Sequence, residues 1–245
     1  MKGVITAAGL GRRSGLDGKM RKEMLPVYDL RGGKLVLRPI IDVIISGLHG
    51  HGIEEVAVVL DPSDRWTREY INSEFPEVEV LFQEEKRGFG HAVLMARDFV
   101  GSHDFVLNAG DGLILNRDAM KALTSAKSGI HLVLMRVDDP RRYGTAAISD
   151  EIGVIKVNGV VEKSENPPSH LALCAVYRLP GKIFSRLDGD GSANVELTPA
   201  IDSLIRAGEP AVATIIERKK WVSVGKAESY VDVLKETLSA CSKPI

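Results

Sequence analysis

The part of this chain that most constrains its fold is the N-terminal segment, residues 4–27. It opens with the apolar run VITAA, which is typical of a buried strand. Gly9 and Gly11 follow at once, and small residues let backbone N–H groups approach a phosphate closely. Five cations then occur within eleven residues: Arg12, Arg13, Lys19, Arg21 and Lys22. This pattern predicts a site for a nucleoside triphosphate.

Two common phosphate-binding motifs do not fit this segment. A dinucleotide-binding fingerprint, G-x-G-x-x-G, needs a third glycine where the chain has Ser14. It also needs a helix that Gly15 and Gly18 would interrupt, and a following strand for which Pro26 comes too early. A nicotinamide-dependent oxidoreductase is therefore disfavoured, and no P-loop sequence occurs. The remaining alternative is a solvated basic loop, which spacing alone leaves open.

Further along the chain, apolar runs of strand length alternate with segments of helical periodicity. This alternation predicts an α/β fold with a largely parallel sheet. Strands are expected at residues 55–60, 78–82, 104–108 and 130–137, and helices at 39–48, 65–75, 90–100 and 118–125. From residue 143 onward we expect short β segments at 144–148, 153–157 and 160–163, strands at 169–179, 211–216 and 220–224, and helices at 180–187, 196–207 and 227–240. Ser63 or Asp64 is expected to cap the second helix.

The composition of the chain narrows its partners and compartment. The formal net charge of −1 gives no strong attraction to nucleic acid or to a membrane surface. Cys174 and Cys241 are far apart and form no C-x-x-C pair, which disfavours a disulfide framework or a zinc site. The sequence opens without a secretory leader and holds no apolar run of about 18–20 residues. We therefore expect a cytoplasmic protein with neither nucleic acid nor membrane as a partner.

Two polar segments follow expected strands, where ligands gather in open α/β sheets. Gln83 follows the third strand, and its amide offers a donor and an acceptor that suit the edge of uracil or thymine. Gly88 and Gly90 would let the backbone come close to a base or a phosphate. Asp111 follows the fourth strand between two glycines, where it could hold Mg²⁺ against phosphates. An ordinary surface glutamine and a turn aspartate are the alternatives.

The residues GLGRR (9–13) and KEMLPV (22–27) resemble the signature of the sugar-1-phosphate nucleotidylyltransferases, in particular UTP–glucose-1-phosphate uridylyltransferases and glucose-1-phosphate thymidylyltransferases. The family signature runs G-x-G-T-R and then P-K-x-M-L-P. The chain departs from it with Arg12 in place of Thr and Arg21 in place of Pro. The resemblance implies that Arg13 and Lys22 grip the phosphates.

The resemblance continues in the segment QEEKRGFGHAV (83–93) and at the fourth strand. It implies base recognition by Gln83 and Gly88 and a metal ligand at Asp111, so Mg²⁺ is the expected cofactor. The implied catalytic residues are Arg13, Lys22 and Asp111. The implied nucleotide-binding residues are Ala8, Gly9, Leu10, Gly11, Gln83, Gly88 and Asp111.

In the second half, the pairs Tyr143-Gly144 and Glu162-Lys163 resemble the family's Y-G-V and V-E-K-P. They imply that Gly144, Glu162 and Lys163 bind the sugar phosphate. The segment ELT at residues 196–198 resembles a family helix start, for which both a capping role and a sugar contact stay open.

The segment WVSVG (221–225) departs from the family's W-x-D-x-G, whose Asp is the second protein ligand of Mg²⁺. Ser223 stands at that position. Three interpretations stay open: Asp111 holds the metal with phosphates and waters, another carboxylate such as Asp17 or Glu228 substitutes, or catalysis is impaired.

The resemblance implies a Rossmann-like, three-layer nucleotidyltransferase fold with a mixed, mainly parallel central sheet and added strands in the second half. It implies one domain, residues 1–245, with a nucleotide-binding half (1–137) and a sugar-phosphate-binding half (138–245). The expected reaction joins UTP or dTTP to a sugar 1-phosphate, with glucose 1-phosphate as the first candidate, to give a nucleotide sugar and pyrophosphate. The alternative is a catalytically impaired binding or regulatory module. CTP stays open as the nucleotide, and a homo-oligomer is compatible with the family.

Overall fold

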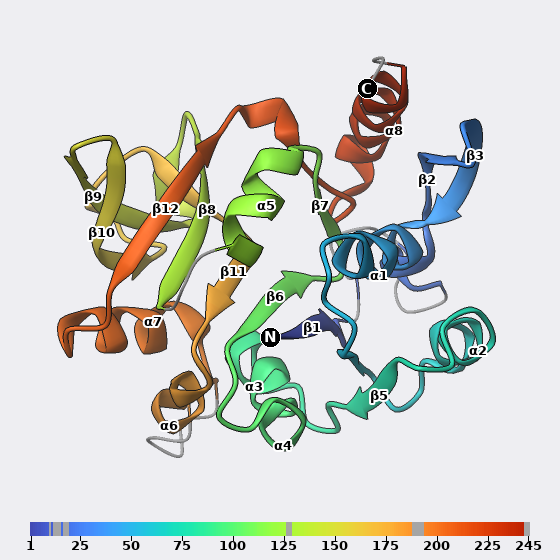
Figure 1. The fold of residues 1–245 in the computed structure, drawn as a ribbon, viewed down its shortest axis with the longest axis horizontal. Coiled ribbons are helices and arrows are strands. Elements are labelled where there is room, and N and C mark those ends of the chain that lie inside the picture. The colour runs from blue at the N-terminus through green and yellow to red at the C-terminus, as the bar shows by residue number, and fades with distance from the viewer. Residues whose placement is uncertain (10, 12–15, 17–19, 126–128, 188–193, 243–245) are drawn as a thin grey trace.

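The fold is built around a nine-stranded mixed sheet in the order β5-β4-β1-β6-β11-β8-β12-β10-β9 (Figure 1). In this computed structural model we describe residues 1–9, 11, 16, 20–125, 129–187 and 194–242. The nucleotide half contributes four parallel strands: β1 Lys2–Ala7, β4 Val56–Leu60, β5 Glu79–Phe82 and β6 Phe105–Ala109. Because parallel strands end at the same edge, the loops after β1, β4 and β5 come together there.

The second half continues the sheet with mixed directions. Its strands are β8 Ile130–Arg136, β9 Gly144–Glu151, β10 Val154–Glu162, β11 Leu171–Leu179 and β12 Ala211–Ile216. Strand β11 is antiparallel to both β6 and β8, whereas β8 and β12 are parallel. The expected Rossmann-like fold with added strands is therefore confirmed.

Helices cover both faces of the sheet, which gives the three layers. The helices are α1 Ile40–Gly50, α2 Arg65–Glu74, α3 Phe89–Leu94, α4 Arg97–Val100, α5 Arg117–Ser125, α6 Phe184–Leu187, α7 Leu197–Arg206 and α8 Tyr230–Cys241. One core cluster joins α1, α2, α5 and α8 to the face that carries Ile5, and the other joins α3, α4, α6 and α7 to the face that carries Val4. Neighbouring strand residues thus point to opposite layers.

Two small sheets lie beside the main one. The hairpin β2 Pro26–Arg31 and β3 Lys34–Pro39 turns at Gly32 and Gly33, which both have positive φ. The second pair is β7 Gly112–Ile114 with β13 Trp221–Ser223. Short 3₁₀ turns complete the chain: η2 Lys22–Met24, η3 Pro140–Arg142, η4 Gly181–Ile183, η5 Arg218–Lys220 and η6 Ala227–Ser229.

Most expected elements are confirmed, and Asp64 is the cap of α2, because its Oδ1 accepts a hydrogen bond from the Thr67 amide at 3.2 Å. The single helix expected at 90–100 was wrong in part, since α3 and α4 are separate helices that meet at Met95 and Ala96. The β segments expected at 153–157 and 160–163 form one bulged strand, β10. The helix expected at 180–187 is a 3₁₀ turn followed by one short helix.

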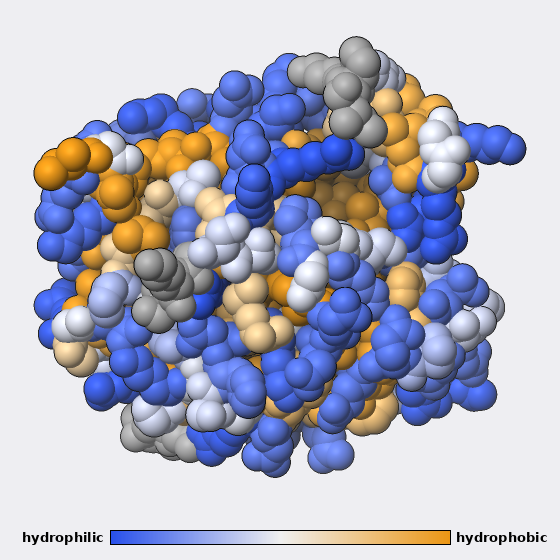
Figure 2. Space-filling view, viewed as in Figure 1, coloured by the Kyte–Doolittle hydropathy of each residue, from blue (hydrophilic) through white to orange (hydrophobic). Residues whose placement is uncertain are grey.

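The surface view in Figure 2 is mainly hydrophilic, with hydrophobic areas where β9, β10 and α8 lie in Figure 1. Exposed apolar residues on these elements and at the β9–β10 turn include Ile152, Val154 and Val231. Among the described residues, no helix is both long enough and apolar enough to span a bilayer.

Candidate active site

Two adjoining cavities lie at the edge of the sheet where β1, β5 and β6 end. The first has a volume of about 390 Å³ and the second about 750 Å³, and Gly225 lines both. The first cavity gathers the predicted residues of the nucleotide group: Ala8, Gly9, Gly11, Lys22, Gln83 and Gly88. The second is lined by Asp111, Tyr143 and Ser223, among others. Leu10 and Arg13 lie outside the described residues.

Lys22 and Asp111 form an ion pair between the two cavities. Lys22 lies in the 3₁₀ turn η2, and Asp111 lies in the turn after β6. The distance from Lys22 Nζ to Asp111 Oδ2 is 2.6 Å. Both side chains are mostly buried, so solvent screens their interaction less than it would at the surface. A cation and a carboxylate thus face the same point from two loops that are 89 residues apart.

Glu23 lies next to this pair in the interior. Only 1% of its surface is exposed, and its Oε1 is 3.9 Å from Lys22 Nζ. Burial raises the pKa of Glu23 from 4.5 to about 8, although the charge of Lys22 opposes this shift. The free protein therefore holds Glu23 mainly as a neutral acid at pH 7.

Gln83 is buried at the end of β5 with its amide fixed. Its Nε2 donates to the Gly88 carbonyl oxygen at 3.1 Å and lies 3.2 Å from His91 Nδ1. Since a carbonyl only accepts hydrogen bonds, the amide nitrogen must face Gly88. The side chain can then offer Oε1 as an acceptor toward a base.

Gly88 faces the same cavity and also packs against the second half of the chain. Its φ is +98°, and a Cβ there would contact Asn194 and lie 2.7 Å from the Val195 carbonyl oxygen. Val195 also accepts from the Gly90 amide at 2.9 Å. The absence of a side chain at residue 88 is therefore required by the positive φ and by packing against the second half of the chain.

The three residues predicted to bind the sugar phosphate are also brought together. Gly144 pairs with Glu162 across β9 and β10, and a Cβ at Gly144 would lie 3.0 Å from Glu162 Oε2. Lys163 Nζ lies 3.1 Å from Glu162 Oε1. Thr198, at the start of α7, donates to Glu162 Oε2 at 2.6 Å, so it orients this carboxylate. The Lys163 amide binds the carbonyl of Tyr143, which lines the second cavity.

The side chains of Ser223 and Asp111 both lie close to Gly225. A Cβ at Gly225 would be 3.2 Å from both Asp111 Oδ2 and Ser223 Oγ, and the Val224 amide binds the Asp111 carbonyl at 2.9 Å. Of the two proposed substitute carboxylates, Glu228 is exposed and absent from the described lining of both cavities, whereas Asp17 is outside the described residues. Within the described part of the chain, no three acidic, His or Cys side chains cluster as a metal site.

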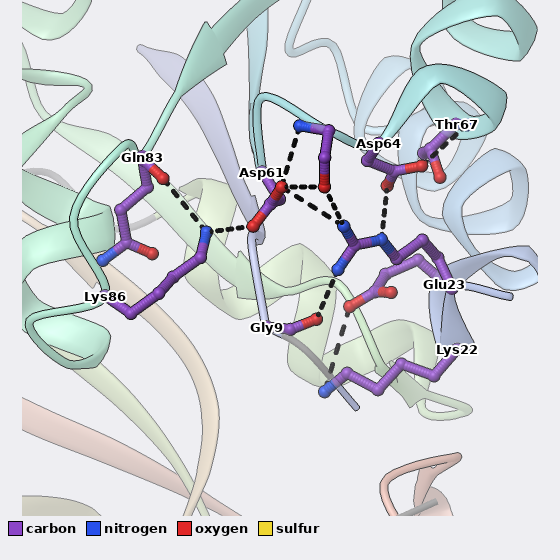
Figure 3. A network of polar contacts seen from close by, with 10 residues as sticks. Gly9, Lys22, Glu23, Asp61, Asp64, Thr67, Gln83 and Lys86 are labelled. Atoms are coloured by element: carbon purple, nitrogen blue, oxygen red, sulfur yellow. Dashed lines mark hydrogen bonds and ion pairs between the residues drawn. The ribbon is translucent and has the colours of Figure 1, made fainter. Parts of the chain in front are cut away.

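A buried ion network beside the first cavity was missed by sequence reasoning. Arg21 pairs with both Asp61 and Asp64, and Lys86 pairs with Asp61 (Figure 3). The signals available in the sequence were the unusual Arg21 and two acids, Asp61 and Asp64, in the segment that follows a predicted strand.

The fold and the cavities define an α/β protein with a cationic pocket at the carboxyl edge of its parallel strands. The chain belongs to the nucleotidyl transferase family, whose sequence profile matches residues 2–240, and within it to the sugar-1-phosphate nucleotidyltransferases.

Three known proteins illustrate this membership. UTP–glucose-1-phosphate uridylyltransferase 2 of Streptococcus pyogenes is 32% identical over 244 residues, covering 83% of this chain and 79% of that protein. A glucose-1-phosphate thymidylyltransferase of Streptomyces griseus is 28% identical over 242 residues, which are 95% of this chain and 65% of that protein. A low-salt glycan biosynthesis nucleotidyltransferase of Haloferax volcanii is 27% identical, covering 95% of this chain and 64% of that protein. The chain thus spans slightly less than two thirds of the length of the last two.

The fold itself is shared with solved structures. A UDP-glucose pyrophosphorylase in complex with UDP-glucose superposes with a TM-score of 0.79 at 22% identity, over 97% of each chain. A glucose-1-phosphate thymidylyltransferase structure from Bacillus anthracis gives 0.77 at 24% identity, over 100% of this chain and 97% of that one.

Proposed function

We propose that this protein transfers a nucleotidyl group from UTP or dTTP to a sugar 1-phosphate, with glucose 1-phosphate as the first candidate. The observation that carries the proposal is the Lys22–Asp111 pair, 2.6 Å apart, at the junction of two cavities. One cavity holds the residues expected to bind the nucleotide, and the other adjoins those expected to bind the sugar phosphate. A transfer reaction needs its two substrates to meet at one cationic point.

In the proposed reaction, a phosphate oxygen of the sugar 1-phosphate attacks the α-phosphorus of the nucleotide. A new P–O bond forms, and the bond to pyrophosphate breaks in line. The protein has little covalent work to do, so positioning and charge neutralisation dominate. Lys22, together with Arg13, is proposed to neutralise charge on the phosphates. Glu162, oriented by Thr198, is proposed to accept hydrogen bonds from the sugar hydroxyls, and Lys163 to bind the sugar's phosphate.

We propose Asp111 as the protein ligand of Mg²⁺, with phosphate and water oxygens as the other ligands. The donor set fits this ion, because Mg²⁺ prefers oxygen ligands and commonly keeps several waters. The neighbouring Ser223 offers an uncharged oxygen. Bound there, Mg²⁺ would supply positive charge at the reacting phosphates.

The orientation of Gln83 favours uracil or thymine over cytosine. With its amide nitrogen engaged by Gly88, the free Oε1 accepts a hydrogen bond. Uracil and thymine carry an N–H at ring position 3, whereas cytosine has an acceptor there. An acceptor that faces an acceptor leaves both unsatisfied, which is costly in a buried site. We therefore propose UTP or dTTP, and not CTP.

The test is pyrophosphate release from UTP, dTTP, CTP, ATP or GTP with glucose 1-phosphate and Mg²⁺. Release with UTP or dTTP supports the proposal. Lys22→Ala is expected to lower turnover at least about tenfold, because it removes a charge from the transition state. Lys156→Ala is the matched control and should leave the rate unchanged, because Lys156 is exposed, is paired with Glu151 near the β9–β10 turn and lines neither cavity within the described residues.

An impaired binding module is the competing interpretation, motivated by Ser223. It is not favoured, since the named relatives are enzymes. It would replace the present proposal if nucleotide raised the melting temperature while no substrate pair released pyrophosphate. A single domain over residues 1–245, a cytoplasmic location and a homo-oligomer stay predictions.

A further inference from the structure

Arg21 is the centre of a buried polar network beside the nucleotide cavity. Its Nη1 donates to the Gly9 carbonyl oxygen at 3.4 Å, and its Nη2 donates to Ser63 Oγ at 3.1 Å. The guanidinium group also lies 3.3 Å from Asp61 Oδ1 and 3.6 Å from Asp64 Oδ2. Asp61 in turn lies 2.6 Å from Lys86 Nζ, which donates to the Gln83 carbonyl oxygen at 3.0 Å (Figure 3).

The network is balanced in charge and largely withdrawn from water. Two cations face two carboxylates, and only 7% of the Arg21 side chain and 10% of the Asp61 side chain are exposed. Burial by itself would raise the pKa of Asp61, but the ion pair with Lys86 and the hydrogen bonds from Ser63 outweigh this effect and hold the pKa at about 2. A buried ion network of this kind contributes little net stability, because desolvation offsets the attraction. Its presence is better explained by the geometry that it fixes.

The network ties together the two walls of the nucleotide cavity. Gly9 belongs to the loop after β1, where the triphosphate is proposed to bind, and Gln83 belongs to the loop after β5, where the base is proposed to bind. Asp61 follows β4, the strand that lies between β1 and β5. Lys86 itself lines the cavity. A shift of the Asp61 carboxylate would therefore move both walls relative to each other.

We propose that Arg21, acting through Asp61 and Lys86, is a positioning residue that sets the distance between the phosphate-binding loop and the base-binding loop. The proposal rests on the proposed nucleotide site. Arg21 acts on the nucleotide alone, because its contacts do not reach Glu162, Lys163 or the rest of the proposed sugar-phosphate group. Its loss weakens nucleotide binding and leaves the affinity for the sugar phosphate unchanged.

Arg38 provides a matched control elsewhere in the chain. It is as buried as Arg21, it is bonded to Asp42 with Nε–Oδ2 at 3.0 Å, and it is also paired with Asp29. Arg38 lines neither cavity within the described residues. A substitution of Arg38 by lysine thus disturbs a comparable ion network without touching the proposed site.

The experiment compares wild type, Arg21→Lys, Asp61→Asn and Arg38→Lys. Calorimetric titration gives the dissociation constants of UTP and dTTP, steady-state kinetics give both KM values, and a thermal melt gives Tm. Lysine keeps the charge of Arg21 but cannot span Gly9 and both carboxylates. We expect Arg21→Lys and Asp61→Asn to weaken nucleotide binding about fivefold or more, which corresponds to one or two buried hydrogen bonds. In these two variants the KM for glucose 1-phosphate should stay within twofold of the wild-type value. Arg38→Lys should lower Tm and leave nucleotide binding and both KM values unchanged.

Nucleotide binding unchanged in a folded Arg21→Lys or Asp61→Asn variant would overturn the proposal, as would an equal change in both KM values. Asp61→Asn decides the matter if Arg21→Lys does not fold. The calorimetric titration does not depend on turnover. If wild type binds UTP but releases no pyrophosphate, the proposed reaction is refuted, and the binding constants of the variants still test the role of the network. A wild type that binds neither UTP nor dTTP refutes both.

Discussion

Glu23 gives a stability prediction whose size can be worked out from the structure. Its carboxyl group is buried beside Lys22, and its Oε2 has no hydrogen-bond partner among the described residues. Burial raises its pKa to about 8, against 4.5 for an exposed carboxyl group. The folded protein therefore binds a proton more tightly than the unfolded chain does. The stability that the folded protein gains from this tighter proton binding is fully present below pH 4.5 and is lost as the pH rises through 8.

The magnitude follows from the two pKa values. Between pH 5 and pH 9 the unfolded chain gains stability from ionising Glu23, whereas the folded protein ionises it only above about pH 8. At about 1.36 kcal/mol for each pKa unit, the free energy of unfolding should fall by about 4 kcal/mol over this range because of this one group. Glu23→Gln keeps the shape and removes the titration. The difference in stability between variant and wild type should therefore grow by that amount.

The assay is urea unfolding at a series of pH values, followed by the fluorescence of Trp66 and Trp221, without nucleotide or Mg²⁺. Glu54→Gln is the control, since Glu54 is exposed and its substitution should leave the pH dependence unchanged. A Glu23→Gln curve that runs parallel to the wild-type curve within about 1 kcal/mol would refute the reasoning. It would mean that Lys22 keeps Glu23 ionised in the folded protein.

Two further outcomes test the site. Ser223→Asp should lower the Mg²⁺ concentration needed for half-maximal pyrophosphate release at least about fivefold, because it places a second carboxylate beside Asp111; a Mg²⁺ titration that does not move would separate Ser223 from the metal. Gly88→Ala should cost about 1–3 kcal/mol of stability, since alanine is strained at a φ of +98° and its Cβ would press on Val195. Urea unfolding at pH 7 measures this cost, and an unchanged midpoint would show that the loop adapts.

The elements of the main sheet could be predicted because their sequence signals are strong. Strand β4 is a fully buried apolar run, β6 is fully buried and apolar except for Asn108, and α2 has a recognisable cap in Asp64. The hairpin of β2 and β3 was missed because it lies outside the main sheet and its side chains are largely half-buried or exposed. It therefore lacks the regular alternation of buried and polar residues that identifies a strand. The turn signal at Gly32 and Gly33 was present without that pattern around it.

Individual residues of the candidate site could be predicted from the sequence, but the contacts between them could not. Gln83 and Asp111 each follow a strand, and strand ends are where ligands gather in this kind of sheet. The pairing of Arg21 with Asp61 and Asp64 could not be predicted, because the partners are about 40 residues apart and no local periodicity links them. The burial of Glu23 could not be predicted either, since a glutamate next to a lysine is usually exposed on the surface.

The wall of the nucleotide cavity depends on both halves of the chain. Gly88 and Gly90 lie against Val195, whose amide also binds the Arg87 carbonyl at 2.6 Å. The loop that carries the proposed base-binding residues is thus fixed by a segment that follows it by about a hundred residues. The same segment leads into α7, where Thr198 orients Glu162 in the proposed sugar-phosphate group. A displacement of residues 194–198 would therefore shift both the base-binding loop and the sugar-phosphate group. The proposed sites for the two substrates are thus positioned by the same segment.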